Sequence, residues 1–147
     1  GKMKILAPVD GSKYSMDALK VVVDFAKNRQ AEIYVINVVQ DIEGIDFEIS
    51  ASEKERLRGR LEKGAEDILQ QARRVLAAGN VTATFKTIAG ADSVPEAIID
   101  FAEKEKMDLI IIGSRGLSPS SRFRMGSVAS RVVRYSPCSV YVVKLPA

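Results

Sequence analysis

The chain has 147 residues and a mass of 16.0 kDa, the usual size of one domain. Hydrophobic residues make up 46% and charged residues 28%, which excludes a disordered, collagen-like or rod-like coiled-coil protein. The formal net charge of +3 is too small to indicate a nucleic-acid partner by itself. The absence of histidine excludes Ser-His-Asp and Cys-His catalysis, and a single cysteine excludes an intrachain disulfide.

Apolar runs alternate with helical patterns along the chain. Five strands are predicted, at Lys4–Val9, Ala31–Val39, Val81–Ala89, Leu109–Ile112 and Ser139–Lys144. Four helices are predicted between them, the first capped by Ser15, the second by Ser52 and ending at Gly79-Asn80, the third by Ser93, and the fourth spanning Gly126–Tyr135. Residues 41–50 are expected to form an irregular connection.

Strict alternation of strands and helices predicts an α/β fold: a single domain over residues 1–147, with an open, parallel, five-stranded sheet and helices on both faces. Two strand orders fit, 3-2-1-4-5 and 2-1-3-4-5. We favour 3-2-1-4-5, because the first and fourth strands are the most apolar and therefore the best central strands, whereas the third carries Thr82, Thr84 and Lys86.

Gly1 and Lys2 precede Met3 and are expected to be a remnant outside the natural sequence. The first predicted strand follows almost at once, so we expect no signal peptide. No apolar run approaches the length of a membrane span, and membrane insertion is not expected. With its lone Cys138, the chain is expected to work in a reducing cytoplasm.

Ligands of open parallel sheets bind beyond the carboxyl ends of the strands, where the strand order reverses. For the order 3-2-1-4-5 this crevice lies between the first and fourth strands. The segments that follow these strands are Asp10-Gly11-Ser12 and Gly113-Ser114-Arg115-Gly116. The sequence therefore places a Gly-x-x-Gly turn where the fold predicts a ligand.

A second glycine turn, Gly126-Ser127, follows nine residues after Gly116 and begins the fourth helix. Glycines let the backbone approach a phosphate, and a helix N-terminus offers free N–H groups and the positive end of its dipole. We therefore predict that both turns close on one chain of phosphates, with charge from Arg115 and from Arg122 or Arg124. The alternative is that Gly113 and Gly116 only permit a tight turn and that Ser127 only caps the helix.

The excess positive charge lies in one segment. Residues 113–135 carry no acidic residue and no lysine, so their net charge is +5 and the other residues sum to −2; the arginines are Arg115, Arg122, Arg124, Arg131 and Arg134. Such a local concentration favours a small anionic ligand, with a solvated basic loop as the alternative. Five arginines without interleaved aromatic residues make nucleic acid an unfavoured partner.

Asp10 has two interpretations of similar weight. It is either a turn or cap residue, or an acceptor for a ribose hydroxyl or a water-mediated metal ligand. A P-loop and a Gly-x-Gly-x-x-Gly motif are both absent from the sequence. Asp10 and Asp108 are the only acidic residues expected near the crevice, and neither stands out as a base that would activate water.

These motifs resemble the universal stress protein family. The spacing Gly113-x2-Gly116-x9-Gly126-Ser127 matches that family's nucleotide signature, Gly-x2-Gly-x9-Gly-Ser/Thr. The resemblance covers the full chain and is carried also by residues 5–12, 108–116 and 136–143. It implies the 3-2-1-4-5 fold, of the Rossmann-like or adenine nucleotide alpha hydrolase-like type, and ATP binding in the branch that keeps the glycines.

The resemblance also implies roles for individual residues. Adenine would lie against Val9, Val38 and Ile112, next to Pro8, and Asp10 would lie near the nucleoside. The ribose and phosphates would lie near Gly113, Arg115, Gly116, Gly126, Ser127 and Val128. Mg2+ or Mn2+ would accompany the phosphates, and a homodimer would form through Ser139–Lys144, an apolar edge strand. The chain departs from the family pattern at Pro119-Ser120-Ser121 and in residues 90–95.

We therefore expect a cytoplasmic ATP-binding stress protein that acts as a nucleotide-dependent regulator or scaffold. One alternative is a slow Mg-dependent ATPase, which would need only positioning and a metal ion. The other is an interaction module that binds no nucleotide. The sequence does not define the stress signal, the protein partner, the choice among ATP, ADP and AMP, or phosphorylation within Ser118–Ser121.

Overall fold

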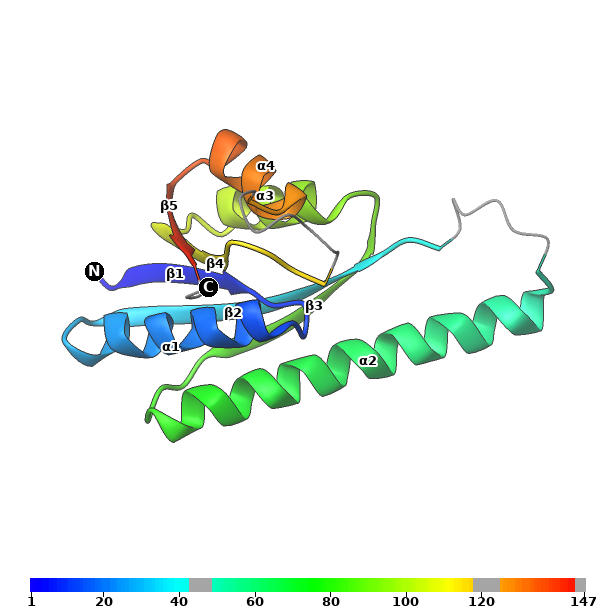
Figure 1. The fold of residues 1–147 in the computed structure, drawn as a ribbon, viewed down its shortest axis with the longest axis horizontal. Coiled ribbons are helices and arrows are strands. Elements are labelled where there is room, and N and C mark those ends of the chain that lie inside the picture. The colour runs from blue at the N-terminus through cyan, green and yellow to red at the C-terminus, as the bar shows by residue number, and fades with distance from the viewer. Residues whose placement is uncertain (43–48, 118–124, 145–147) are drawn as a thin grey trace.

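Five parallel strands form one sheet in the computed structural model, which describes residues 1–42, 49–117 and 125–144 (Figure 1). In chain order they are β1 (Met3–Pro8), β2 (Ala31–Gln40), β3 (Thr84–Ala91), β4 (Leu109–Gly113) and β5 (Ser139–Val143). They lie side by side in the order β3-β2-β1-β4-β5, and every neighbouring pair is parallel. The predicted strand order is confirmed, and the order 2-1-3-4-5 is excluded.

Two helices cover each face of the sheet (Figure 1). The helices are α1 (Lys13–Lys27), α2 (Ala51–Ala78), α3 (Val94–Lys104) and α4 (Ser127–Tyr135). Successive strand residues point to opposite faces. Ile5 and Ala7 of β1 accordingly pack in the cluster under α1 and α2, and Leu6 packs in the cluster under α3 and α4. Two covered faces explain why β1 and β4 are almost continuously apolar.

The N-caps of three helices were predicted from the sequence, and the structure confirms one of them. Ser93 caps α3, as predicted. The other two predictions were wrong: α1 is capped by Ser12 rather than Ser15, and α2 by Ser50 rather than Ser52. The Ser-x-x-Glu pattern occurs twice in overlapping positions, and the earlier copy is used, with Ser50 accepting the N–H of Glu53 at 3.1 Å. Ser12 accepts the N–H of Ser15 at 3.2 Å, so α1 begins directly after the turn that follows β1.

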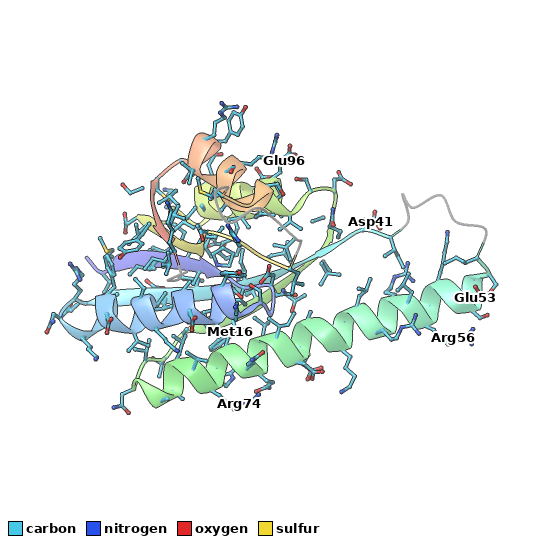
Figure 2. The ribbon with its side chains drawn as sticks, in the orientation of Figure 1. Met16, Asp41, Glu53, Arg56, Arg74 and Glu96 are labelled. Atoms are coloured by element: carbon cyan, nitrogen blue, oxygen red, sulfur yellow. The ribbon has the colours of Figure 1, made fainter. Side chains whose placement is uncertain are left out.

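Helix α2 extends beyond the sheet that it covers. It has 28 residues, of which only Ala65, Ala72 and Leu76 are buried, all in its second half. Figure 1 shows the first turns projecting past the body of the domain, and Figure 2 shows Glu53 and Arg56 on this projecting part. Across the described ranges, no helix is both long and apolar enough to cross a membrane.

We predict opposite sensitivities for two leucines of α2. Leu76 is fully buried against the sheet, so Leu76→Ala should lower the free energy of unfolding by about 2–5 kcal/mol. Leu61 is 37% exposed, and Leu61→Ala should change the free energy of unfolding by less than about 1 kcal/mol. Urea denaturation of both variants measures the difference. Equal losses would contradict the placement of the first half of α2 outside the core.

Candidate functional site

The candidate site lies at the carboxyl ends of β1 and β4, which are neighbours in the sheet. The chain leaves β1 toward β2 on one side and reaches β4 on the other, so this is where the strand order reverses. The segment after β1 turns into α1 at Ser12, and the segment after β4 continues through Ser114 to Leu117. The two segments named from the sequence therefore lie at the point where the strand order reverses.

The carboxylate of Asp10 joins these two segments. Its Oδ1 accepts the N–H of Ser12 at 2.9 Å, and its Oδ2 accepts the N–H of Leu117 at 3.2 Å. The backbone N–H of Asp10 donates to Ser15 Oγ at 3.3 Å. This geometry is that of the turn interpretation, because the backbone N–H that donates to the carboxylate belongs to Ser12, two residues after Asp10. The ribose and metal interpretations of Asp10 stay predictions.

The two glycine turns lie side by side. The N–H of Gly126 donates to the carbonyl of Ser114 at 2.7 Å, and a Cβ at Gly126 would lie 3.4 Å from Arg115 Cα. Ser114 is buried, and its own N–H extends the β4–β5 pairing by donating to the carbonyl of Val143 at 2.9 Å. The end of β4 thus anchors both turns, and the geometry on which the predicted phosphate site depends is present.

Gly113 and Gly116 are required by packing. A Cβ at Gly113 would lie 2.9 Å from the backbone oxygen of Tyr14, in the first turn of α1. A Cβ at Gly116 would overlap Asp10 Oδ2. Real Cβ atoms do not approach a backbone atom this closely, so a side chain at Gly113 would force the end of β4 away from α1, whereas one at Gly116 would displace the Asp10 carboxylate. The tight-turn interpretation accounts for these two glycines without a ligand.

Helix α4 presents its N-terminus next to these turns. Gly126 is the N-cap, and no side chain of the described residues caps this helix. The alternative that Ser127 caps α4 was wrong, because Ser127 is the first residue inside the helix. The first N–H groups of a helix have no partner within it, so those of Ser127 and Val128 point beyond the N-terminal end of α4.

The residues expected around adenine do not share one surface. Val38 and Ile112 belong to the cluster under α3 and α4, whereas Val9 packs in the cluster under α1 and α2. Pro8, the last residue of β1, pairs with Ile36 of β2. The side chain of Val9 therefore faces the side of the sheet opposite to Val38 and Ile112, and its contact with adenine stays a prediction.

Asn37 was missed by the sequence reasoning. It is buried within β2, and its Nδ2 donates to the carbonyl of Val9 at 2.7 Å. This bond fixes the backbone between the end of β1 and Asp10. A buried amide needs a hydrogen-bond partner. The available signal was one amide inside the apolar run from Ile33 to Val39.

The arginines do not all gather at the crevice. Arg131 lies 3.5 Å from Glu96 of α3, a residue that Figure 2 labels near α4, and it also lies over the ring of Tyr135. Arg134 is exposed in the last turn of α4. Arg115 lies within the first glycine turn, between Gly113 and Gly116. Arg122 and Arg124 lie outside the described residues, as does the segment Ser118–Ser121.

Asp108 is not near the crevice, so that expectation was wrong. Its Oδ2 accepts the backbone N–H of Lys4 at 2.8 Å, beside the amino ends of β1 and β4. Asp10 is therefore the one expected acid at the site. Within the described part of the chain, no group of three or more acidic, Cys or His residues could hold a metal ion.

Comparisons with known proteins agree with this fold and motif set. The model of the universal stress protein family matches residues 2–144, and the chain belongs to that family. A universal stress protein of Methanocaldococcus jannaschii is 33% identical over 143 residues, which cover 97% of this chain and 82% of the relative. The solved structure of UspA from Lactobacillus plantarum has a TM-score of 0.78 at 26% identity, covering 97% of this chain and 99% of that one.

Some solved proteins of the same fold contain adenine nucleotides. A universal stress protein solved in complex with cAMP has a TM-score of 0.72 at 23% identity, covering 96% of each chain. Two others, from Arabidopsis thaliana and Archaeoglobus fulgidus, are described as bound to AMP and dAMP, at 14% and 21% identity. At these identities the likeness concerns the Rossmann-like fold.

We predict that Gly113→Ala destabilises the domain. Its Cβ would press on the Tyr14 backbone, and the resulting overpacking should cost about 1–3 kcal/mol of unfolding free energy. The matched control is Gly59→Ala in α2, where a Cβ meets nothing within 4 Å, and the better helix former should add about 0.5–1 kcal/mol. Thermal or urea unfolding distinguishes the two, and a neutral Gly113→Ala would contradict the close approach of β4 to α1.

Proposed function

We propose that this chain binds an adenine nucleotide, with ATP as the expected ligand and ADP or AMP as alternatives, at the carboxyl ends of β1 and β4. The observation that carries the proposal is the 2.7 Å bond from the N–H of Gly126 to the carbonyl of Ser114. This bond brings the uncapped start of α4 next to the Gly113–Gly116 turn. Backbone N–H groups converging beside a helix N-terminus are a typical phosphate-binding arrangement.

The phosphates would contact backbone rather than long side chains. The N–H groups of Ser127 and Val128 and the hydroxyl of Ser127 would donate to phosphate oxygens at the start of α4. Gly116 and Gly126 would allow a close approach, and Arg115, which is half-buried in the Gly113–Gly116 turn, would supply positive charge. A helix N-terminus favours a negative charge by about 0.3–1 kcal/mol when exposed, so several contacts of this kind are needed for useful affinity.

The nucleoside would lie on the α3–α4 side of the crevice. Val38 and Ile112 face this side and would contact adenine, while Pro8 and Val9 would contribute through the backbone at the end of β1. Asp10 would lie beside the ribose. The relatives of the same fold that hold cAMP, AMP or dAMP support the choice of an adenine nucleotide.

Regulation or scaffolding is proposed in preference to catalysis. Both oxygens of Asp10 already accept backbone N–H groups, which lowers its capacity to activate water. A divalent ion, Mg2+ or Mn2+, would be held mainly by the phosphates of a bound nucleotide. The alternative function is that of an interaction module that binds no nucleotide. Calorimetry with ATP, ADP, AMP and cAMP distinguishes the two functions. The cytoplasm is proposed as the compartment, because one cysteine leaves no intrachain disulfide.

We also propose a homodimer through β5, whose edge would pair with a second copy. Of the two edge strands, β3 carries Thr84, Lys86 and Thr87, whereas β5 is Ser-Val-Tyr-Val-Val. Lysine on an edge strand discourages pairing between sheets, and an apolar edge needs cover. Tyr141 of β5 is 44% exposed although its ring stacks edge-on against Phe25 at 5.6 Å.

Gly126→Val should weaken ATP binding by at least about tenfold, or about 1.4 kcal/mol, because a branched side chain would cover the N–H groups at the start of α4. The negative φ of −61° at Gly126 is allowed for valine, so the fold should persist. Calorimetry measures the affinity. Gly64→Val in α2, where a Cβ meets open space, is the control and should bind ATP as the unchanged chain does. Unchanged affinity in Gly126→Val would count against the phosphate role of this turn.

Tyr141→Lys should convert the proposed dimer to a monomer, because it would place a charge in the apolar edge of β5. Sedimentation velocity over a concentration series measures the assembly state. Leu61→Lys is the matched control: Leu61 is similarly exposed at 37%, but it lies on α2, away from β5. A monomeric unchanged chain, or dissociation by the control alone, would contradict the β5 interface.

A further inference from the structure

The hydrogen bond between Asp10 and Leu117 links segments that are 107 residues apart in the sequence. We propose that Asp10 is a positioning residue: its carboxylate holds the Ser114–Leu117 loop against the end of β1 and thereby sets the position of the phosphate-binding backbone. This inference rests on the proposed nucleotide site. It differs from the expected role of Asp10 as a ribose acceptor, because it acts on the loop rather than on the nucleoside.

The carboxylate is held rigidly on the β1 side. Oδ1 accepts the N–H of Ser12 at 2.9 Å, and the N–H of Asp10 donates to Ser15 Oγ at 3.3 Å. Ser15 is itself buried, and its hydroxyl donates to the carbonyl of Ser12 at 3.0 Å. With Oδ1 and the backbone fixed, Oδ2 is directed at the loop that follows β4. A hydrogen bond to an ionised acceptor is stronger than one between neutral groups.

The loop depends on this bond at its far end. Its near end is anchored by two backbone bonds at Ser114, to Val143 and to Gly126. The side chain of Leu117 is 71% exposed and therefore supplies little packing. Loss of the bond to Asp10 should therefore loosen Gly116 and Leu117 more than Ser114, which keeps its two backbone bonds. The effect should therefore fall on the part of the site assigned to phosphates.

Gly116 and Asp10 form a matched pair. A Cβ at position 116 would overlap Asp10 Oδ2, and among the described residues the one other atom within 4 Å of it is Asp10 Cγ, at 3.6 Å. Gly116→Ala should therefore displace the carboxylate from Leu117, although Asp10 itself is unchanged. In an Asp10→Ala background the obstructing atoms are gone, and the same alanine at 116 has space. This reciprocity predicts coupling between the two substitutions.

The first experiment compares ligands that differ only in their phosphates. Calorimetry with ATP and with adenosine is performed on the unchanged chain and on Asp10→Asn. An amide keeps the size of the side chain but can accept with only one atom, so one of the two N–H groups loses its partner. We expect ATP affinity to fall by about tenfold or more, and adenosine affinity to change by less than roughly twofold.

Three results of this comparison would overturn the inference. Equal losses for ATP and adenosine would assign Asp10 to a direct nucleoside contact. Unchanged affinity for both would reduce Asp10 to a turn residue. If the unchanged chain binds neither ligand, both the proposed function and this inference are wrong. This result differs from the other two, in which the unchanged chain binds ATP.

The second experiment is a double-substitution cycle with Asp10→Ala, Gly116→Ala and the combined variant, which keeps the inference testable if Asp10→Asn is poorly folded. Thermal unfolding of each variant verifies that it is folded before ATP affinity is measured. We expect each single change to weaken ATP binding by about tenfold. The ATP affinity of the combined variant should lie within roughly twofold of that of either single variant. Fully additive losses would show that the two residues act independently and would overturn the inference.

Discussion

The candidate site depends on how closely three backbone segments approach one another at the ends of β1 and β4. The N–H of Gly126 reaches the carbonyl of Ser114 at 2.7 Å, and the space at Gly113 and Gly116 is filled by the Tyr14 backbone and the Asp10 carboxylate. A side chain at Gly113 could not be placed without moving β4 or α1, and one at Gly116 could not be placed without moving the Asp10 carboxylate. The glycine pattern therefore has a cause in packing alone, and the backbone left exposed by that packing is the surface that we assign to phosphates.

The apolar pattern was sufficient to predict the fold. Nearly continuous apolar strands alternating with amphipathic helices required a covered parallel sheet, and the polar residues of the third strand placed it at an edge. Element ends were less predictable, because Ser50 and Ser52 both begin a Ser-x-x-Glu pattern and local sequence does not choose between them. The choice of Ser12 over Ser15 depends on the turn after β1, which is a tertiary feature.

The site was predictable at its backbone and less so at its side chains. The proximity of Gly116 and Gly126 was predictable, because the topology fixes where the residues after β4 and before α4 must lie. The side of the sheet that the Val9 side chain faces was not predictable from the spacing of motifs. Side chains alternate between the two faces along a strand, and Val9 follows the last strand residue, Pro8, so its direction depends on the turn. Asn37 and the loop bond of Asp10 were missed because each joins residues distant in the chain, and only the folded register brings them together.

The projecting half of α2 has a consequence for local stability. Between Ala51 and Gly64 no residue is buried, so this segment is held by its own backbone bonds and by surface pairs such as Glu55 with Arg58 at 2.8 Å. An exposed ion pair of this kind adds only about 0.3–0.5 kcal/mol. These turns therefore open by fraying, at a small fraction of the cost of global unfolding, and their amides exchange with solvent long before those around Ala72. A protease that needs an extended substrate would therefore cleave α2 in these turns before it cleaves the helix around Ala72.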